Sequence, residues 1–367
     1  MISLLSTGLL AVAFCVGALY VLMPLAQKIG LLDKPNSRKR HGRATPVVGG
    51  VAIYIAFLLS WQFVDDFTVS TSLLLWIGLV LVVGVIDDKF DISFRIRLGT
   101  HAAIVLGIFL TDGLVVNEIG AILGNDISEF LGNASATFYG PTIAVIFTGI
   151  GVVGAVNSTN MMDGLDGLLG SLVLISMIAV FGLSISSENL PVQSFSIHAV
   201  VAMIGALAGF LWLNSRVYFD SARVFLGDAG STTLGLILAY VLIDYTQGST
   251  RIFSPVLAGW ILGLPLLDAS SVILRRVLDG KSPFAPDRNH LHHRLIDSGV
   301  GVNNTVLAMA MIHTILVLVG VLLSFTVPLW SDMILFWGFV MLVFMMTLRS
   351  TAAESKIRQF LGAESGE

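Results

Sequence analysis

Charge is scarce in this chain. Only 12% of its 367 residues are charged and 55% are hydrophobic, and the mean hydropathy is +0.89. Soluble domains carry about 25% charged residues, so the composition excludes a soluble globular protein and offers no basic surface for nucleic acid. The chain is therefore predicted to be an integral membrane protein.

Cysteine is almost absent as well. The single one, Cys15, excludes a disulfide within the chain, and its place in an apolar run suits a small packing residue. That run has no basic residues before it and no small-residue cleavage site after it. We therefore expect it to remain as the first membrane span rather than to be removed as a signal peptide.

Long apolar runs are what the chain has instead. A helix needs about 20 apolar residues to cross a bilayer, and such runs recur between polar clusters along the whole chain. The pattern predicts an all-α polytopic bundle of about eleven transmembrane helices. The expected spans cover residues 3–25, 47–63, 71–86, 98–111, 141–156, 168–186, 195–213, 229–244, 255–274, 305–326 and 332–349.

The basic residues predict how these spans are oriented. With the N-terminus outside, in the periplasm, every lysine and arginine except Arg251 falls in an inner connection. The same inner connections hold nearly all of the Asp, Asn and His residues that could act chemically. We therefore expect a single transmembrane catalytic domain over 1–349, with cytoplasmic catalytic loops, and a short cytoplasmic tail over 350–367.

The first chemical motif is DDKFD, at the inner end of the third expected span. Asp87 and Asp91 would share one face of a helical turn, and Asp88 stands beside them. Neighbouring carboxylates repel unless a cation holds them, which favours a hard divalent ion that also bridges to phosphates, Mg²⁺ or Mn²⁺. A solvated cluster of loop acids is the alternative.

The second motif is NSTNMMDGLDG, residues 157–167, at the inner end of the fifth expected span. Its acids, Asp163 and Asp166, alternate with glycines, which permit a close backbone approach to a ligand. Plain turns would use the same residue types, so both interpretations stay open.

The third motif is VFLGDAGST, residues 224–232, where Asp228 lies just before an expected helix. Backbone amides at a helix N-terminus favour anions, so this turn can set a metal-bound phosphate against the positive end of the helix dipole. An N-cap role for Asp228 is the alternative. Phe225 could stack on a nucleobase, although core or lipid-facing packing is the commoner use of phenylalanine.

The fourth motif is a basic loop over residues 275–295, which gathers arginines around His290, His292 and His293. Without a nearby cysteine zinc is disfavoured, and imidazoles beside arginines suit hydrogen bonds to phosphate or proton transfer. A loop held at anionic lipid headgroups would explain the arginines but not the histidines.

The remaining polar residues fall into two groups. In residues 31–50 the positive-inside bias explains the basic side chains but not Asp33 and His41. Inside the spans, isolated histidines are expected to form hydrogen bonds between helices, whereas the intramembrane acid Asp268 is a candidate for function. The histidines concerned are His101, His198 and His313.

In this order the motifs resemble the polyprenyl-phosphate N-acetylhexosamine-1-phosphate transferases of glycosyltransferase family 4. The resemblance runs from about residue 28 to residue 300 and includes all five inner loops. The segment DKPNSRKRH and the box HLHH resemble the branch that uses UDP-N-acetylglucosamine more than the branch that transfers phospho-muramoyl-pentapeptide.

The resemblance implies an enzyme that transfers N-acetylglucosamine 1-phosphate from UDP-N-acetylglucosamine to undecaprenyl phosphate and releases UMP. The reaction would take place on the cytoplasmic face of the bacterial inner membrane and would begin O-antigen or a related surface polysaccharide. Mg²⁺, or Mn²⁺, is the implied cofactor. A homodimer, another UDP-N-acetylhexosamine and UDP-MurNAc-pentapeptide as donor are left open.

Carried over residue by residue, the resemblance also implies roles. Catalysis would fall to Asp87, Asp88, Asp163 and His290, and metal binding to Asp228, Asp88 and Asp163. The nucleotide would meet Asn160, Asp166, Asn214 and Phe225, and the phosphates and sugar would meet Arg276, His292, His293, Asp33, Lys34 and His41.

The chemistry of the two substrates agrees with this interpretation. Both are anions, so a metal and arginines must offset their repulsion. The lipid phosphate is largely dianionic at neutral pH, which favours direct in-line attack on the β-phosphorus, with Asp87 orienting it or removing its residual proton. A covalent aspartyl-phosphate intermediate stays open.

Two other classes fit the sequence less well. An intramembrane prenyltransferase also uses aspartate-rich loops and Mg²⁺, but it has no evident use for the histidine box. A cation-coupled transporter places its acids near the bilayer midplane in broken helices, whereas the acids here cluster at the inner ends of the spans.

Overall fold

The computed structural model describes residues 4–33, 44–64, 69–116, 140–187, 195–248, 251–282 and 289–360. The described part is a helical bundle with one small pair of antiparallel strands, β1 (Leu32–Asp33) and β2 (Thr45–Pro46). The helices are α1 (Leu4–Ile29), α2 (Gly49–Phe63), α3 (Thr71–Phe90), α4 (Phe94–Asp112), α7 (Gly140–Met162), α8 (Leu168–Ile185), α9 (Ile197–Asn214), α10 (Gly227–Asp244), α11 (Pro255–Leu278), α12 (Leu291–Asp297), α13 (Val302–Thr326) and α14 (Leu329–Phe360).

Each expected span coincides with one of these helices, which confirms an all-α polytopic membrane protein. By length and composition, 8 of the described helices can cross a membrane, and α2 is a shorter apolar helix. Several helices continue past the expected boundaries, since α7 ends at Met162 and α14 at Phe360. Polar residues end the contact with lipid without ending the backbone hydrogen bonds. The number of crossings and the orientation stay predictions.

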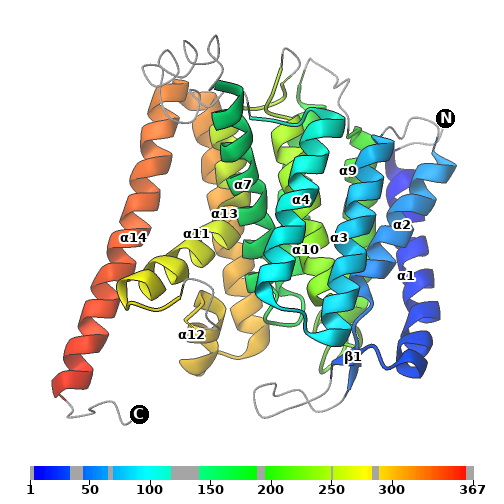
Figure 1. The fold of residues 1–367 in the computed structure, drawn as a ribbon, viewed down its shortest axis with the longest axis horizontal. Coiled ribbons are helices and arrows are strands. Elements are labelled where there is room, and N and C mark those ends of the chain that lie inside the picture. The colour runs from blue at the N-terminus through cyan, green and yellow to red at the C-terminus, as the bar shows by residue number, and fades with distance from the viewer. Residues whose placement is uncertain are drawn as a thin grey trace.

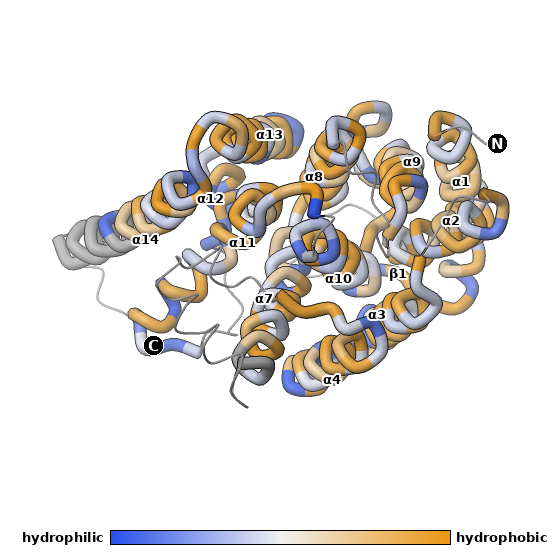
Figure 2. The backbone as a smooth tube through the Cα atoms, turned by 90° about the horizontal axis from the view of Figure 1, so that it is seen from above, coloured by the Kyte–Doolittle hydropathy of each residue, from blue (hydrophilic) through white to orange (hydrophobic). Residues whose placement is uncertain are grey.

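The long helices stand side by side, with α14 at one edge of the bundle (Figure 1). The end of α3, the start of α10, the strand β1 and the short helix α12 all lie at the lower end in this view, which we call the site end. Seen from above, most of the coloured tube of the long helices is hydrophobic (Figure 2). Such faces suit contact with lipid or with a neighbouring helix.

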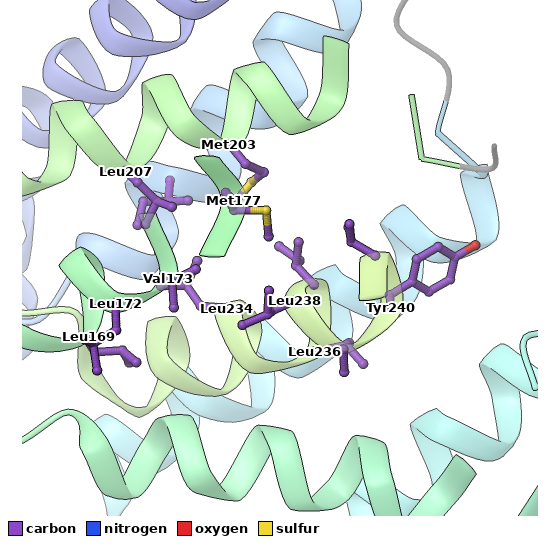
Figure 3. Close-up of a cluster of buried hydrophobic side chains, with 14 of the residues drawn as sticks. Leu169, Leu172, Val173, Met177, Met203, Leu207, Leu234, Leu236, Leu238 and Tyr240 are labelled. Atoms are coloured by element: carbon purple, nitrogen blue, oxygen red, sulfur yellow. The ribbon is translucent and has the colours of Figure 1, made fainter. Parts of the chain in front are cut away.

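Helix α10 occupies the centre of the bundle. It contacts α2, α3, α7, α8 and α11, and all its residues from Ala229 to Leu242 are buried. Figure 3 shows side chains of α8, α9 and α10 packed together, among them Met177, Met203 and Leu234. A helix that is apolar on every side needs such a surrounding, so α10 gives the other elements a fixed reference.

Small residues bring neighbouring backbones into contact with the first turn of α10. A Cβ atom placed on Gly50 of α2 would overlap the Cα atom of Gly230, and one on Gly84 of α3 would overlap the Cα atom of Ala229. Close approach through small residues is a common way to pack helices in membranes. Both neighbours therefore meet α10 at the site end.

Helix α11 contains a proline, Pro265, in its interior. Pro265 has no N–H to give to the carbonyl of Ile261, and the Ser176 hydroxyl of α8 donates a hydrogen bond to that carbonyl instead, at 3.0 Å. Nε2 of His313 on α13 lies 3.0 Å from the same hydroxyl oxygen. Beyond this point α11, drawn in yellow, leaves the direction of the bundle and runs toward α14 (Figure 1).

The expected hydrogen bonds of the buried histidines are partly present. His313 bonds Ser176 as described, and Nδ1 of His198 lies 2.9 Å from the Thr7 hydroxyl of α1. The prediction of bonds between helices is confirmed for these two. For His101 it stays a prediction, and Nδ1 of this ring is buried without a partner among the described residues.

Replacing Ser176 should test the repair of α11. Ser176→Ala leaves the buried carbonyl of Ile261 without its donor, and we expect a loss of about 1–3 kcal/mol, seen as a lower Tm in detergent. Ser60→Ala is the matched control, because the Ser60 hydroxyl donates only within its own helix, to Ala56. Equal melting of the two variants would contradict the assignment.

Candidate active site

Asp88 joins the end of α3 to the start of α10. Its two carboxylate oxygens accept hydrogen bonds from the backbone N–H groups of Asp228, at 2.8 Å, and Ala229, at 3.1 Å. These N–H groups belong to the first turn of α10 and have no partner within their own helix. The preceding Gly227 has φ +76°, and a Cβ atom there would lie 2.5 Å from Oδ2 of Asp88. Only glycine fits this position without a shift.

Arg97 ties Asp87 and Asp228 together. Its Nη1 donates to Oδ2 of Asp87 at 2.5 Å and to Oδ2 of Asp228 at 3.2 Å. Asp87 is buried, and its other oxygen accepts the backbone N–H of Ile92 at 2.9 Å. One guanidinium therefore balances two carboxylates that lie far apart in the sequence.

Sequence analysis missed Arg97, because the positive-inside bias already accounted for it. A signal was available in the spacing. Only residues 91–93 separate α3 from α4, so Arg97 on the first turns of α4 returns to the level of Asp87. A short connection between antiparallel helices makes such a pair predictable.

Asn160, in the last turn of α7, completes the surroundings of Asp228. Its Nδ2 donates to Oδ1 of Asp228 at 2.6 Å and to the hydroxyl of Ser231 at 3.0 Å. Asp228 thus lies between α4 and α7, with one carboxylate oxygen bonded to each. Such charge-assisted bonds from two sides hold the side chain in a defined orientation.

Asp91 does not join this group. The helix ends before it, Asp91 takes a left-handed conformation at φ 51°, and its side chain is exposed. The expectation that Asp87 and Asp91 share a face was therefore wrong. The physical reason is that the i and i+4 positions face the same side only while the helix continues.

Asp163 adds a further acid to the surroundings of Asp228 and Asp88. It follows the last turn of α7, and burial together with the negative charges of Asp228, Asp88 and Asp166 raises its pKa to about 8. Carboxylate oxygens are the ligands that a hard divalent cation prefers, so this donor set fits Mg²⁺ chemically. Among the described residues, no three carboxylates, imidazoles or thiols already converge as an assembled metal site.

Asp166 and Asn214 join the connection that follows α7 to the connection that follows α9. Oδ2 of Asp166 accepts from Nε of Arg216 at 2.7 Å and from the backbone N–H of Ala222 at 3.1 Å. Asn214 accepts the N–H of Gly167 at 2.8 Å and donates to the carbonyl of Val224 at 2.9 Å. Asn214 is therefore engaged within the protein, and its expected contact with a nucleotide stays a prediction.

Phe225 connects the N-terminal segment to this region. Its backbone N–H donates to the carbonyl of Pro46 at 2.8 Å, and its carbonyl accepts the N–H of Gly49 at 2.9 Å. Strand β2 belongs to the pair that also contains Asp33, so this acid lies at the site end. Lys34 and His41 lie outside the described residues.

The histidine box forms the short helix α12 and the residue before it. His292 is fully buried, its ring lies against Gly164 in the loop that carries Asp163, and both ring nitrogens lack a hydrogen-bond partner among the described residues. Burial, and then the neighbouring His293, lowers the pKa of His292 to about 3. The ring is therefore neutral, which suits hydrogen bonding rather than charge. Arg276 is buried near the end of α11.

Comparison with known proteins supplies the family. The model of glycosyl transferase family 4 matches residues 70–246. The undecaprenyl-phosphate alpha-N-acetylglucosaminyl 1-phosphate transferase of Escherichia coli (strain K12) is 34% identical over 335 residues, which is 90% of this chain and 88% of the relative. The protein of the same name from Pasteurella multocida (strain Pm70) is 36% identical over 341 residues, which is 91% and 90%.

This chain belongs to glycosyl transferase family 4. The stretch that matches the family 4 model runs from the residue before α3 to two residues past the end of α10, so it contains both acids that Arg97 contacts. The histidine helix α12 follows outside that stretch. In this member of family 4 the contact of His292 with Gly164 brings the two parts together.

The fit between α3 and α10 can be tested at Gly227. Gly227→Ala should lower Tm by more than the left-handed backbone of the new alanine alone would. The added Cβ displaces Asp88 from the two backbone amides whose hydrogen bonds it accepts, and that loss costs about 1.5–3 kcal/mol. Gly248→Ala is the control, since Gly248 has the same φ of +76° but no atom within 4 Å of an added Cβ. Similar Tm values in detergent for both variants would refute the tight fit.

Proposed function

We propose that this protein transfers N-acetylglucosamine 1-phosphate from UDP-N-acetylglucosamine to undecaprenyl phosphate and releases UMP. The observation that carries the proposal is the cluster of Asp87, Asp88, Asp228 and Asn160 around Arg97, in a chain whose relatives are named for this transfer. The acids lie at the ends of their helices rather than half-way along them, which disfavours a cation-coupled transporter.

The first task of such a site is to bring two anions together. The diphosphate donor and the phosphate acceptor repel each other, and Arg97 and Arg276 supply fixed positive charge at the site end. Asp228, Asp88 and Asp163 would hold Mg²⁺, with Mn²⁺ as the alternative ion, and the bound ion would neutralise charge on the diphosphate.

The second task is the transfer itself. In our proposal an oxygen of the lipid phosphate attacks the β-phosphorus of the donor, the bond from that phosphorus to the bridging oxygen breaks, and UMP leaves with that oxygen. Asp87 orients the acceptor or takes its residual proton. His290 donates a hydrogen bond to the departing or attacking phosphate, or transfers a proton there. The sugar C1–O bond is untouched, so the anomeric configuration persists.

Binding of the donor would use the remaining residues of the site. Asn160, Asp166, Asn214 and Phe225 would meet the nucleotide. The phosphates and sugar would meet Arg276, His292 and His293, with the segment that holds Asp33, Lys34 and His41 beside them. The reaction would take place on the cytoplasmic face of the bacterial inner membrane and open the synthesis of O-antigen or a related surface polysaccharide.

The nucleotide product tests the reaction class. Purified protein with undecaprenyl phosphate, Mg²⁺ and a panel of UDP-sugars should release UMP, and fastest with UDP-N-acetylglucosamine, because the bond broken lies between the two phosphorus atoms. Chromatography of the nucleotides decides the matter. Release of UDP would mean transfer of the sugar without its phosphate, and the proposal would be wrong.

Asp228 is the sharpest single residue to change. Asp228→Asn should lower UMP release by at least about 100-fold while Tm stays close to that of the wild type, since charge is lost but shape is kept. Asp91→Asn is the control from the same acidic region, because Asp91 is exposed and Asn tolerates its left-handed backbone. Undiminished turnover of Asp228→Asn would remove Asp228 from the site.

A further inference from the structure

Asp268 is an acid in the apolar helix α11, three residues beyond Pro265. Its side chain is only 8% exposed, and a carboxylate is costly to bury unless it is paired. The roles proposed above leave it without a task. Its cost must therefore be offset by the groups that it contacts.

Both carboxylate oxygens of Asp268 bond the start of the histidine helix. Oδ2 lies 2.7 Å from Nδ1 of His290, and Oδ1 accepts the backbone N–H of Leu291 at 2.8 Å. A carboxylate can only accept, so Nδ1 of His290 carries the proton in this contact. The other ring nitrogen, Nε2, is then the atom that remains available to bond a substrate.

The same contact fixes the position of α12. This helix has seven residues, from Leu291 to Asp297, and so short a helix does not persist on its own in water. The side chain of its N-cap residue, His290, makes no capping bond, so Asp268 supplies from another helix the acceptor that the N-terminus lacks. His292, the second residue of α12, then lies against Gly164, beside Asp163.

We propose that Asp268 is a positioning residue for the transfer, which acts through His290 by fixing the proton on Nδ1 and the orientation of the ring. This inference rests on the proposed function of the site. Asp268 follows Pro265 within α11, and this helix runs obliquely to its neighbours toward α14, which explains how one of its acids reaches α12 (Figure 1).

The two bonds of Asp268 can be separated by two variants. Asp268→Asn removes the charge that fixes the ring of His290, and kcat for UMP release should fall about 10- to 100-fold, with KM for UDP-N-acetylglucosamine within about threefold. Leu291→Pro removes the N–H that Asp268 caps and leaves the contact of Asp268 with Nδ1 of His290, although it also replaces a side chain that packs against the core. Proline suits the first helical position, and His290 already has φ −61° and ψ 148°, which proline requires of its predecessor.

Leu291→Pro should therefore keep kcat within about threefold of the wild type, even where its Tm is lower. Equal losses in both variants would reduce Asp268 to a cap of α12 and overturn the proposal, as would an unchanged kcat of Asp268→Asn. Asp268→Glu replaces Asp268→Asn if the latter unfolds, because it keeps the charge and displaces it by one methylene. The same loss of kcat is expected.

A third variant tests whether Asp268 acts through His290. The combination of Asp268→Asn with His290→Gln should release UMP no more slowly than His290→Gln alone. Multiplied losses would overturn the proposal. A wild type that makes no UMP would defeat the proposed function itself, whereas these variants are compared only with an active wild type, so the two failures are distinguishable.

Discussion

The contact between Asp88 and the first turn of α10 is the interaction on which the rest of the site depends. A carboxylate accepts two backbone amides at the positive end of a buried helix, and glycine at position 227 leaves room for it. Gly50 and Gly84 let α2 and α3 reach the same turn at backbone distance. Because α10 is packed on every side, the Asp88 carboxylate that bonds its N-terminus is held in a fixed position.

The acids around this contact differ in whether a positive group pairs with them. Asp87 and Asp228 are held together by Arg97, while Asp163 has only negative neighbours among the groups that shift its pKa. Such a site stores repulsion between carboxylates, and a divalent cation or the cationic groups around a bound diphosphate would relieve it. The raised pKa of Asp163 therefore indicates an acid that binding of a cation would help to ionise.

The opposite side of the site is built by a helix that has a proline in its interior. Pro265 removes a hydrogen bond inside the bundle, and Ser176 restores it from α8. Beyond this proline, the last part of α11 carries a buried acid to the start of α12 and two buried arginines toward the site end. The local loss in one helix thus permits a connection between elements that a straight helix would keep apart.

The sequence by itself determined the helices, because burial in lipid requires long apolar runs and these can be read locally. It also determined which residue types gather between them, including Asp87, Asp88, Asp228 and the histidines. Only the tertiary structure decided their partners: Arg97 between two acids, Asp91 turned away, and Asp268 bonded to His290. Hydropathy records whether a residue can lie in the bilayer, whereas a hydrogen bond depends on which helix ends meet and in which direction each one points.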